Sequence, residues 1–116
     1  MKEIIIAIVT GTLVFAGCNN LGTEAEARMT WKQFKKLPQA KCIRKRESGG
    51  NHRIVSSNGL WHGLYQFYTP TWQKMGGTKF APVASQATRK QQHKIAFKTW
   101  KRVGWSPWYH ATKPCY

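Results

Sequence analysis

The sequence contains no aspartate and only four glutamates, which are Glu3, Glu24, Glu26 and Glu47. Three of these lie in the first 27 residues, a stretch with the features of an export segment. If that stretch is removed, Glu47 is the only acidic side chain left in the chain. A Ser-His-Asp triad needs a carboxylate to orient its histidine, and only Glu47 could supply one. Any other carboxylate chemistry in the domain depends on the same group.

Basic side chains, by contrast, are abundant. The 116 residues include 19 Lys and Arg, which give a formal net charge of +15. Without residues 1–27, which hold Lys2 and three glutamates, 18 Lys and Arg face Glu47 alone, a net charge of +17. Such a surface attracts a polyanion, whether nucleic acid, an anionic membrane or an anionic cell wall. The length allows one domain.

The N-terminal stretch predicts export. Lys2 is followed by a nearly unbroken apolar run from Ile4 to Ala16, which is too short for a permanent membrane anchor and suits a secretory signal. Two processing sites remain open: a lipoprotein-like box with lipid on Cys18, and a small-x-small site at 25–27. We therefore expect a protein that is secreted, associated with the cell wall, or anchored by a lipid to the outer face of the membrane. Residues 28–116 are expected to form its folded domain.

Three cysteines form an odd set. Cys18 ends the export segment, whereas Cys42 and Cys115 bracket the expected domain. An exported chain meets an oxidising compartment, which favours a Cys42–Cys115 disulfide over two free thiols. A bridge closing so long a loop would stabilise the fold by roughly 3–5 kcal/mol in the chain-entropy model.

Helix start and stop signals predict several short helices. Thr30 is a suitable N-cap for a helix from Trp31. A second helix is expected over about residues 39–47, stopped by the glycines at 49–50. A third begins near Thr69.

Residues 52–68 differ from these helical stretches, because aromatic and β-branched side chains flank a turn at 56–59 and predict a hairpin-like unit. The longest helix is expected to be capped by Ser85 or Thr88 and to end near Val103. Together these signals predict an α+β, mainly helical domain with a short hairpin. The predicted apolar face of the longest helix and its flank is Ala84, Ala87, Ile95, Phe97, Trp100 and Val103. Its predicted basic face is Lys90, Lys94, Lys98 and Lys101.

Neither a metal nor a cofactor is expected. The four histidines, which we expect on the surface, show no ligand spacing: His52, His62, His93 and His110. No glycine-rich loop matches a nucleotide site. A single carboxyl group surrounded by aromatic residues suits cleavage of a glycosidic bond, in which a carboxylic acid protonates the leaving oxygen. The alternative is that Glu47 is a structural ion-pair partner of an arginine, such as Arg44 on the same side of the helix.

Five sequence blocks, in matching order and spacing, resemble the transglycosylase-like domain of the resuscitation-promoting factors. The resemblance extends from about residue 31 to 115. The blocks are RESGGN at 46–51, GLYQF at 63–67, PTW at 70–72, ATRKQQ at 87–92, and Gly104-Trp105 with Trp108.

This resemblance implies a small lysozyme-like fold with a substrate cleft, and it implies that Glu47 is the catalytic acid. It also implies sugar contacts from Gln66 and Thr71, and it supports the Cys42–Cys115 bridge. Further candidates for substrate binding are Tyr65, Trp72, Gln91 and Trp105, although core packing is the preferred interpretation of Trp72.

Two departures from the family pattern stand out. The family cysteine often directly precedes the catalytic glutamate, whereas Cys42 lies five residues before Glu47. Lys90 stands where the family typically has an acid.

The favoured function is a lytic transglycosylase that cuts the MurNAc-GlcNAc β-1,4 bond. The alternatives are a muramidase that hydrolyses this bond and a basic, non-catalytic wall-binding module. The expected partners are the glycan strands of peptidoglycan and anionic wall polymers, not nucleic acid. Membrane contact is expected only through the signal or a lipid anchor, and the protein is expected to act as a monomer.

Overall fold

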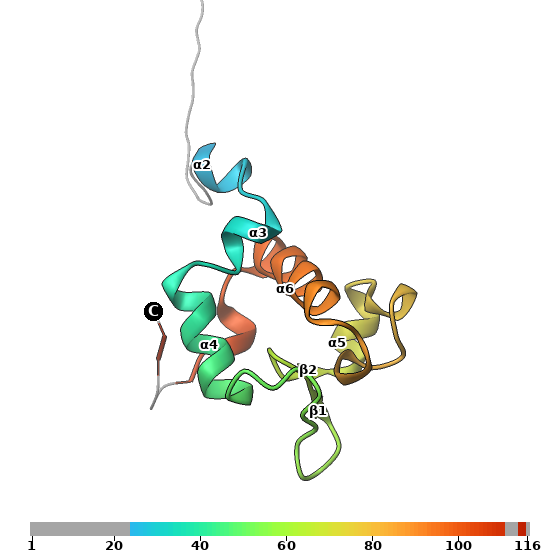
Figure 1. Cartoon of the computed structure of the whole chain (residues 1–116). Helices are drawn as coiled ribbons and strands as arrows, with labels where there is room; N and C mark the ends of the chain where they lie inside the picture. The colour runs from blue at the N-terminus through green and yellow to red at the C-terminus, as the bar shows by residue number, and fades with distance from the viewer. Residues whose placement is uncertain (1–23, 111–113, 116) are drawn as a thin grey trace, which may run out of the picture.

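A computed structural model describes residues 24–110, 114 and 115 (Figure 1). Cys18 and the apolar run of the predicted export signal lie outside these residues. The end of the predicted export segment forms a one-turn helix, α2 (Glu24–Ala27), followed by α3 (Trp31–Phe34). Within the described ranges, no helix is both long and apolar enough to cross a membrane.

The domain is mainly helical, as predicted, and a very short hairpin lies at one edge of it, between α4 and α5 (Figure 1). The two longest helices of the described residues are α4 (Pro38–Ser48) and α6 (Arg89–Val103), and α3 packs against α6. The other helical elements are α5 (Thr69–Lys74) and the 3-10 turns η3 (Gly77–Lys79), η4 (Ala84–Gln86) and η5 (Ser106–Trp108).

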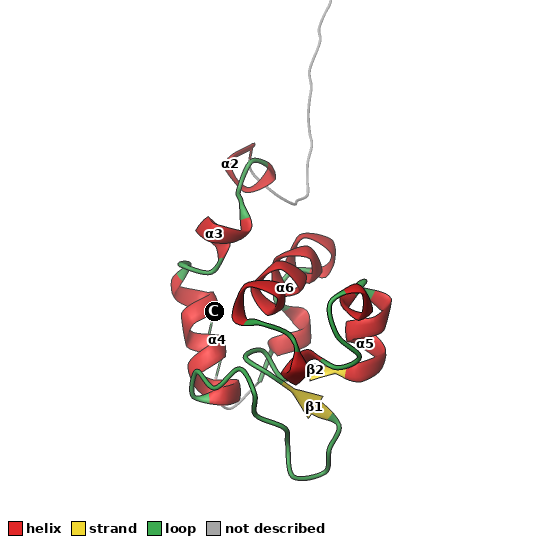
Figure 2. Cartoon of the chain, turned by 45° about the vertical axis from the view of Figure 1, so that its right-hand side comes forward, coloured by secondary structure: helices red, strands yellow, loops and turns green. Residues whose placement is uncertain are grey.

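The hairpin is smaller than the unit predicted over residues 52–68. Strand β1 (Trp61–His62) pairs antiparallel with β2 (Phe67–Tyr68), and Trp61 lies opposite Tyr68 (Figure 2). Val55 contributes only an isolated bridge to His62. In the preceding turn, Oδ1 of Asn58 accepts hydrogen bonds from the backbone N–H of Leu60 at 3.1 Å and from the Ser56 hydroxyl at 2.6 Å, and such local bonds favour a turn over a strand.

Threonine side chains define two helix starts, as the sequence predicts. Thr30 and Thr88 each accept a hydrogen bond from the backbone of the residue three positions on, in capping boxes with Gln33 and Gln91. Ser85 does not cap α6. Its hydroxyl is buried and lies 2.8 Å from Nδ1 of His62 instead.

An aromatic core joins the helices. The ring of Phe34 lies 5.4–6.3 Å from the rings of four other aromatic residues, which are Tyr65, Phe97, Trp100 and Trp105. Trp72 is fully buried, and its indole nitrogen donates to the Ala81 carbonyl at 2.8 Å. A methyl group added at Gly77 would lie 2.2 Å from that indole, so only glycine allows this approach.

The predicted apolar face of α6 is partly wrong. Val103 is 51% exposed, whereas Gln92, His93 and Thr99 are buried alongside Ile95. The buried polar groups are satisfied by hydrogen bonds, which is why they are tolerated there.

Gln92 ties three segments together, because its amide accepts from Leu64 N and donates to the carbonyls of His52 and Ala87. This amide fixes the hairpin region onto α6.

The prediction of four surface histidines is also wrong for two of them, because His62 and His93 are each only 8% exposed. Both rings have hydrogen-bond partners inside the fold. His62 donates from Nε2 to the Gly59 carbonyl, and His93 Nδ1 lies 2.9 Å from the Tyr65 hydroxyl.

The predicted disulfide between Cys42 and Cys115 is present, with Cα atoms 5.7 Å apart and a sequence separation of 73. The bridge fastens the C-terminal segment to the middle of α4.

Candidate functional site

Glu47 lies in the last turn of α4, which ends where Gly49 adopts the left-handed conformation with φ 61°. Its side chain is 14% exposed. A carboxylate at a helix C-terminus faces the negative end of the helix dipole, so it needs positive neighbours. Arg46 donates to Oε2 of Glu47 at 3.0 Å, and Nε2 of His110 lies 3.0 Å from the same oxygen. Arg46 also donates to the carbonyl of Trp108 and thereby joins α4 to η5.

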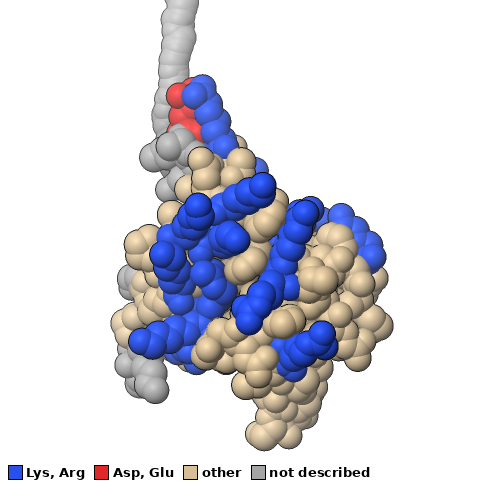
Figure 3. All heavy atoms as spheres, viewed as in Figure 1, with Lys and Arg blue, Asp and Glu red and all other residues tan. Residues whose placement is uncertain are grey.

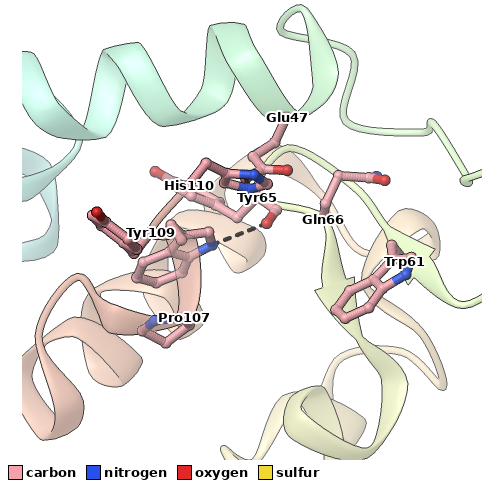
Figure 4. Close-up of a pocket in the computed structure, with 8 residues that line it drawn as sticks. Glu47, Trp61, Tyr65, Gln66, Pro107, Tyr109 and His110 are labelled. Carbon is pink, nitrogen blue, oxygen red and sulfur yellow. Dashed lines mark hydrogen bonds and ion pairs between the residues drawn. The ribbon is translucent and has the colours of Figure 1, made fainter. Parts of the chain in front are cut away.

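A pocket of about 370 Å³ opens beside this carboxylate (Figure 4). Three segments supply its walls: the end of α4, the hairpin and the segment around η5. Figure 4 shows Trp61 on one side of the space and Pro107 with Tyr109 on the other. The lining residues are Glu47, Trp61, Tyr65, Gln66, Pro107, Trp108, Tyr109 and His110.

A second hollow of about 50 Å³ adjoins the first. The two share four lining residues, which are Trp61, Gln66, Pro107 and Trp108. Thr71, at the start of α5, lines the smaller one together with Tyr68. Trp61 and Tyr68 are 41% and 40% exposed, and their ring centroids lie 5.1 Å apart. The combined groove thus runs from Glu47 past Trp61 to Thr71 and exposes aromatic surface along its course.

Gln66 is the one non-glycine residue of the described chain with a positive φ, at 51°. Its amide nitrogen donates to the Gly63 carbonyl at 3.2 Å. A left-handed conformation costs a side-chain-bearing residue on the order of 1–3 kcal/mol and is concentrated at functional sites. It places Gln66 on the wall that both hollows share.

Tyr65 lines the inner wall of the pocket, and a buried hydrogen-bond network holds its side chain in position. Arg44 donates to its hydroxyl at 2.9 Å, and the hydroxyl is hydrogen-bonded to Nδ1 of His93 at 2.9 Å. Burial raises the pKa of Tyr65 to about 12, although the Arg44 guanidinium opposes the shift. Burial, with help from Arg44, lowers the pKa of His93 to about 4. Tyr65 and His93 therefore both stay neutral at pH 7, and Arg44 is the charged member of the network.

The sequence also matches a known protein family. The transglycosylase-like domain family matches residues 27–111, which include every residue that lines the groove. The chain belongs to the transglycosylase-like domain family.

Its similar relatives are named resuscitation-promoting factors. The chain is 48% identical over 62 residues to Rpf1 of Corynebacterium glutamicum, a stretch covering 53% of the chain and 32% of the relative. It is 45% identical over 62 residues to RpfB of Mycolicibacterium smegmatis, covering 53% and 17%. It is 35% identical over 101 residues to RpfA of Mycobacterium tuberculosis, covering 85% and 22%. The matches thus span a third or less of these relatives.

The structure of this transglycosylase-like domain brings four of the seven predicted site residues to the groove. Glu47, Tyr65 and Gln66 line the larger hollow, and Thr71 lines the smaller one.

The other three lie elsewhere. Trp72 is in the core, as the preferred interpretation had it. Gln91 completes the capping box of α6. Trp105 packs against Phe34 and Trp100.

The sequence left the arginine partner of Glu47 open and placed Arg44 near it. Arg44 contacts Tyr65 and the Lys35 carbonyl, whereas Arg46 contacts Glu47. His110 was not recognised, because it lies 63 positions from Glu47 in sequence. The cysteine bridge was the available signal, since it returns the C-terminal segment to α4.

Proposed function

We propose that this domain is a peptidoglycan-cleaving glycosidase that acts as a lytic transglycosylase on the MurNAc-GlcNAc β-1,4 bond. The main supporting observation is that Glu47 is the only carboxylate among the residues lining the groove. Most glycosidases use two carboxylates, one as acid and one as base or nucleophile. A site with one carboxylate favours a reaction in which the substrate supplies the second reactive group.

In the proposed reaction, Glu47 first gives its proton to the glycosidic oxygen as the bond to the anomeric carbon breaks. The substrate's own N-acetyl group stabilises the positive charge at that carbon. The C6 hydroxyl of the same muramyl residue then attacks the anomeric carbon, and its proton returns to Glu47. The products are a free GlcNAc hydroxyl and a 1,6-anhydro-muramyl end, so the enzyme is regenerated without consuming water.

The neighbours of Glu47 have distinct proposed roles. Arg46 and His110 hold one carboxylate oxygen, Oε2, in position through their contacts of 3.0 Å. Because both of these contacts use Oε2, Oε1 is the better candidate for facing the glycosidic oxygen. Trp61 and Tyr109, exposed at 41% and 57%, offer ring faces to the apolar faces of sugars (Figure 4).

We further propose that residues 28–116 act outside the cytoplasm after export, as a monomer, on the glycan strands of the wall. Anionic wall polymers are a second class of partner. A muramidase would use the same groove but deliver water to the anomeric carbon, and it would leave reducing ends instead of anhydro ends.

The direct test is Glu47→Gln in residues 28–116, compared with Lys74→Gln as a control at an exposed position outside the groove. We expect purified Glu47→Gln protein to bind peptidoglycan but to release no soluble fragments, while Lys74→Gln matches the wild type. A non-catalytic wall-binding module predicts no fragments from any of the three proteins. Fragment release by Glu47→Gln at the wild-type rate would refute the role of Glu47.

A further inference from the structure

Three ammonium groups gather around one aromatic ring on the face formed by α3 and α6. Nζ of Lys32, Lys35 and Lys94 lie 5.9, 5.5 and 5.9 Å from the ring centroid of Trp31. We call Trp31 with these three lysines the Trp31 cluster. Because each ammonium lies within 6 Å of one centroid, the three lie within about 12 Å of one another, and like charges at such separations repel. A bound anion would relieve this repulsion.

Neighbouring residues add positive charge around the cluster, namely Arg44 and Arg89. The ring of His93 stacks on Trp31 with centroids 6.3 Å apart. Besides burial, Arg44, Lys35 and Arg89 lower the pKa of His93, so its ring experiences several cations at once. Arg44 is also the residue that donates to the Lys35 carbonyl.

Carboxylates that could balance this charge are scarce on the described part of the chain. In its ion pairs, Glu24 contacts Arg28, and Glu47 contacts Arg46 and His110. Figure 3 shows Lys and Arg spread over the α3, α4 and α6 face, with acidic atoms visible only beside α2.

We propose that the Trp31 cluster is a docking site for a linear polymer of repeating phosphodiester groups attached to the cell wall. This proposal rests on the proposed function for its location, because an exported peptidoglycan enzyme meets its polyanions at the wall. A chain of phosphates supplies successive negative charges to the three ammonium groups and releases counterions as it binds.

The arrangement of aromatics favours a polymer without bases over single-stranded nucleic acid. Single-strand binders offer free aromatic faces on which bases stack. Trp31 already has His93 against its ring and three ammonium groups around it. The well-exposed aromatics Trp61, Tyr68 and Tyr109 lie at or beside the groove instead.

The cluster is also separate from the proposed site of cleavage. None of its four residues lines either hollow of the groove. A wall polymer held there would keep the enzyme on its substrate and leave the groove open to a glycan strand.

The test compares the triple variant K32Q/K35Q/K94Q with R53Q/K74Q/K79Q, a matched control that removes three charges from exposed positions on other elements. Binding is measured to purified poly(glycerol phosphate), to a single-stranded oligodeoxynucleotide with the same number of phosphates, and to phosphate-free peptidoglycan. All proteins also carry Glu47→Gln, so the result does not depend on catalysis. A K32R/K35R/K94R variant changes the same three positions but keeps their charge. It therefore shows whether lost binding comes from misfolding or from the lost charge.

We expect the cluster variant to lose poly(glycerol phosphate) affinity on the order of tenfold and to show a shallower salt dependence, while the control changes little. The arginine variant should bind like the parent protein. Three results would overturn the proposal: an equal loss in the control, which shows bulk charge attraction only; tighter binding of the oligonucleotide than of the polymer; or an equal loss of binding to phosphate-free peptidoglycan. Failure of cleavage by the protein with Glu47 intact would refute the proposed function without changing these binding results.

Discussion

Nε2 of His110 lies 3.0 Å from the carboxylate of Glu47, although the two residues are 63 positions apart in sequence. Two links make this contact possible. Arg46 bonds to the carbonyl of Trp108, and Cys115 is bridged to Cys42 on α4. The C-terminal segment is therefore part of the site, and the disulfide supports the pocket as well as the fold.

Replacing both Cys42 and Cys115 by serine should therefore affect stability and activity together. The bridge closes a loop of 73 residues, so its loss should lower the free energy of unfolding by about 3–5 kcal/mol in the chain-entropy model. For a domain of this size, the melting temperature should fall by more than about 10 °C. Thermal unfolding followed by circular dichroism measures the change.

The control for this experiment is reductant added to the double serine variant, which should have no further effect on its melting temperature. Reduced wild-type protein should behave like the variant. An unchanged melting temperature in both would show that the bridge does not stabilise the domain.

Two tryptophans should separate substrate binding from core packing. Trp61→Ala, at an exposed position of the groove, should raise KM for soluble glycan fragments severalfold while shifting stability by less than about 1 kcal/mol. Trp72→Ala, at a fully buried position, should lower the free energy of unfolding by about 3–5 kcal/mol. Chemical denaturation and steady-state kinetics on both variants measure the contrast. The proposed sugar platform would be wrong if Trp61→Ala kept its wild-type KM.

The stability of the domain should depend on pH through His93. Burial, reinforced by Arg44, Lys35 and Arg89, lowers its pKa from 6.5 to about 4. Between these values the folded state binds fewer protons than the unfolded chain, so the free energy of unfolding falls as pH is lowered from about 6.5 to about 4. Below pH 4 both states are protonated, and the loss from this group is complete.

The variant His93→Gln removes this titration. Its stability should decline less steeply than that of the wild type over the same pH window, as measured by denaturant unfolding at each pH. Parallel pH profiles for the two proteins would contradict the assignment of this dependence to His93.

Replacing Gln66 by glycine should have opposite effects on stability and on activity. Gln66→Gly should raise the free energy of unfolding by about 1 kcal/mol, because glycine adopts a φ of 51° without steric strain. The same change removes an amide from the groove wall and should reduce cleavage. Gln66→Ala is the control, since it loses the amide but keeps the strain. A Gln66→Gly protein with full activity would show that the side chain has no part in the reaction.

Local signals in the sequence predicted much of this fold. Thr30 and Thr88 were recognisable as caps because capping depends on residues only three positions apart. The glycines after residue 48 marked the end of α4, and Cys42 could be paired with Cys115 from the expected compartment alone.

Contacts between distant segments could not be predicted in the same way. His62 and His93 are buried because Ser85 and Tyr65 meet them in space, which spacing along the chain does not reveal. Arg44 and Arg46 lie two residues apart on α4, and only the packing of Tyr65 and Trp108 decides which one reaches Glu47.

The most direct test of the proposed mechanism is mass spectrometry of the fragments that the purified protein releases from peptidoglycan. We expect muropeptides with 1,6-anhydro-muramyl ends from the wild type and none from Glu47→Gln. Reducing ends that incorporate oxygen from labelled water, or the same anhydro fragments from the Glu47→Gln protein, would contradict the account.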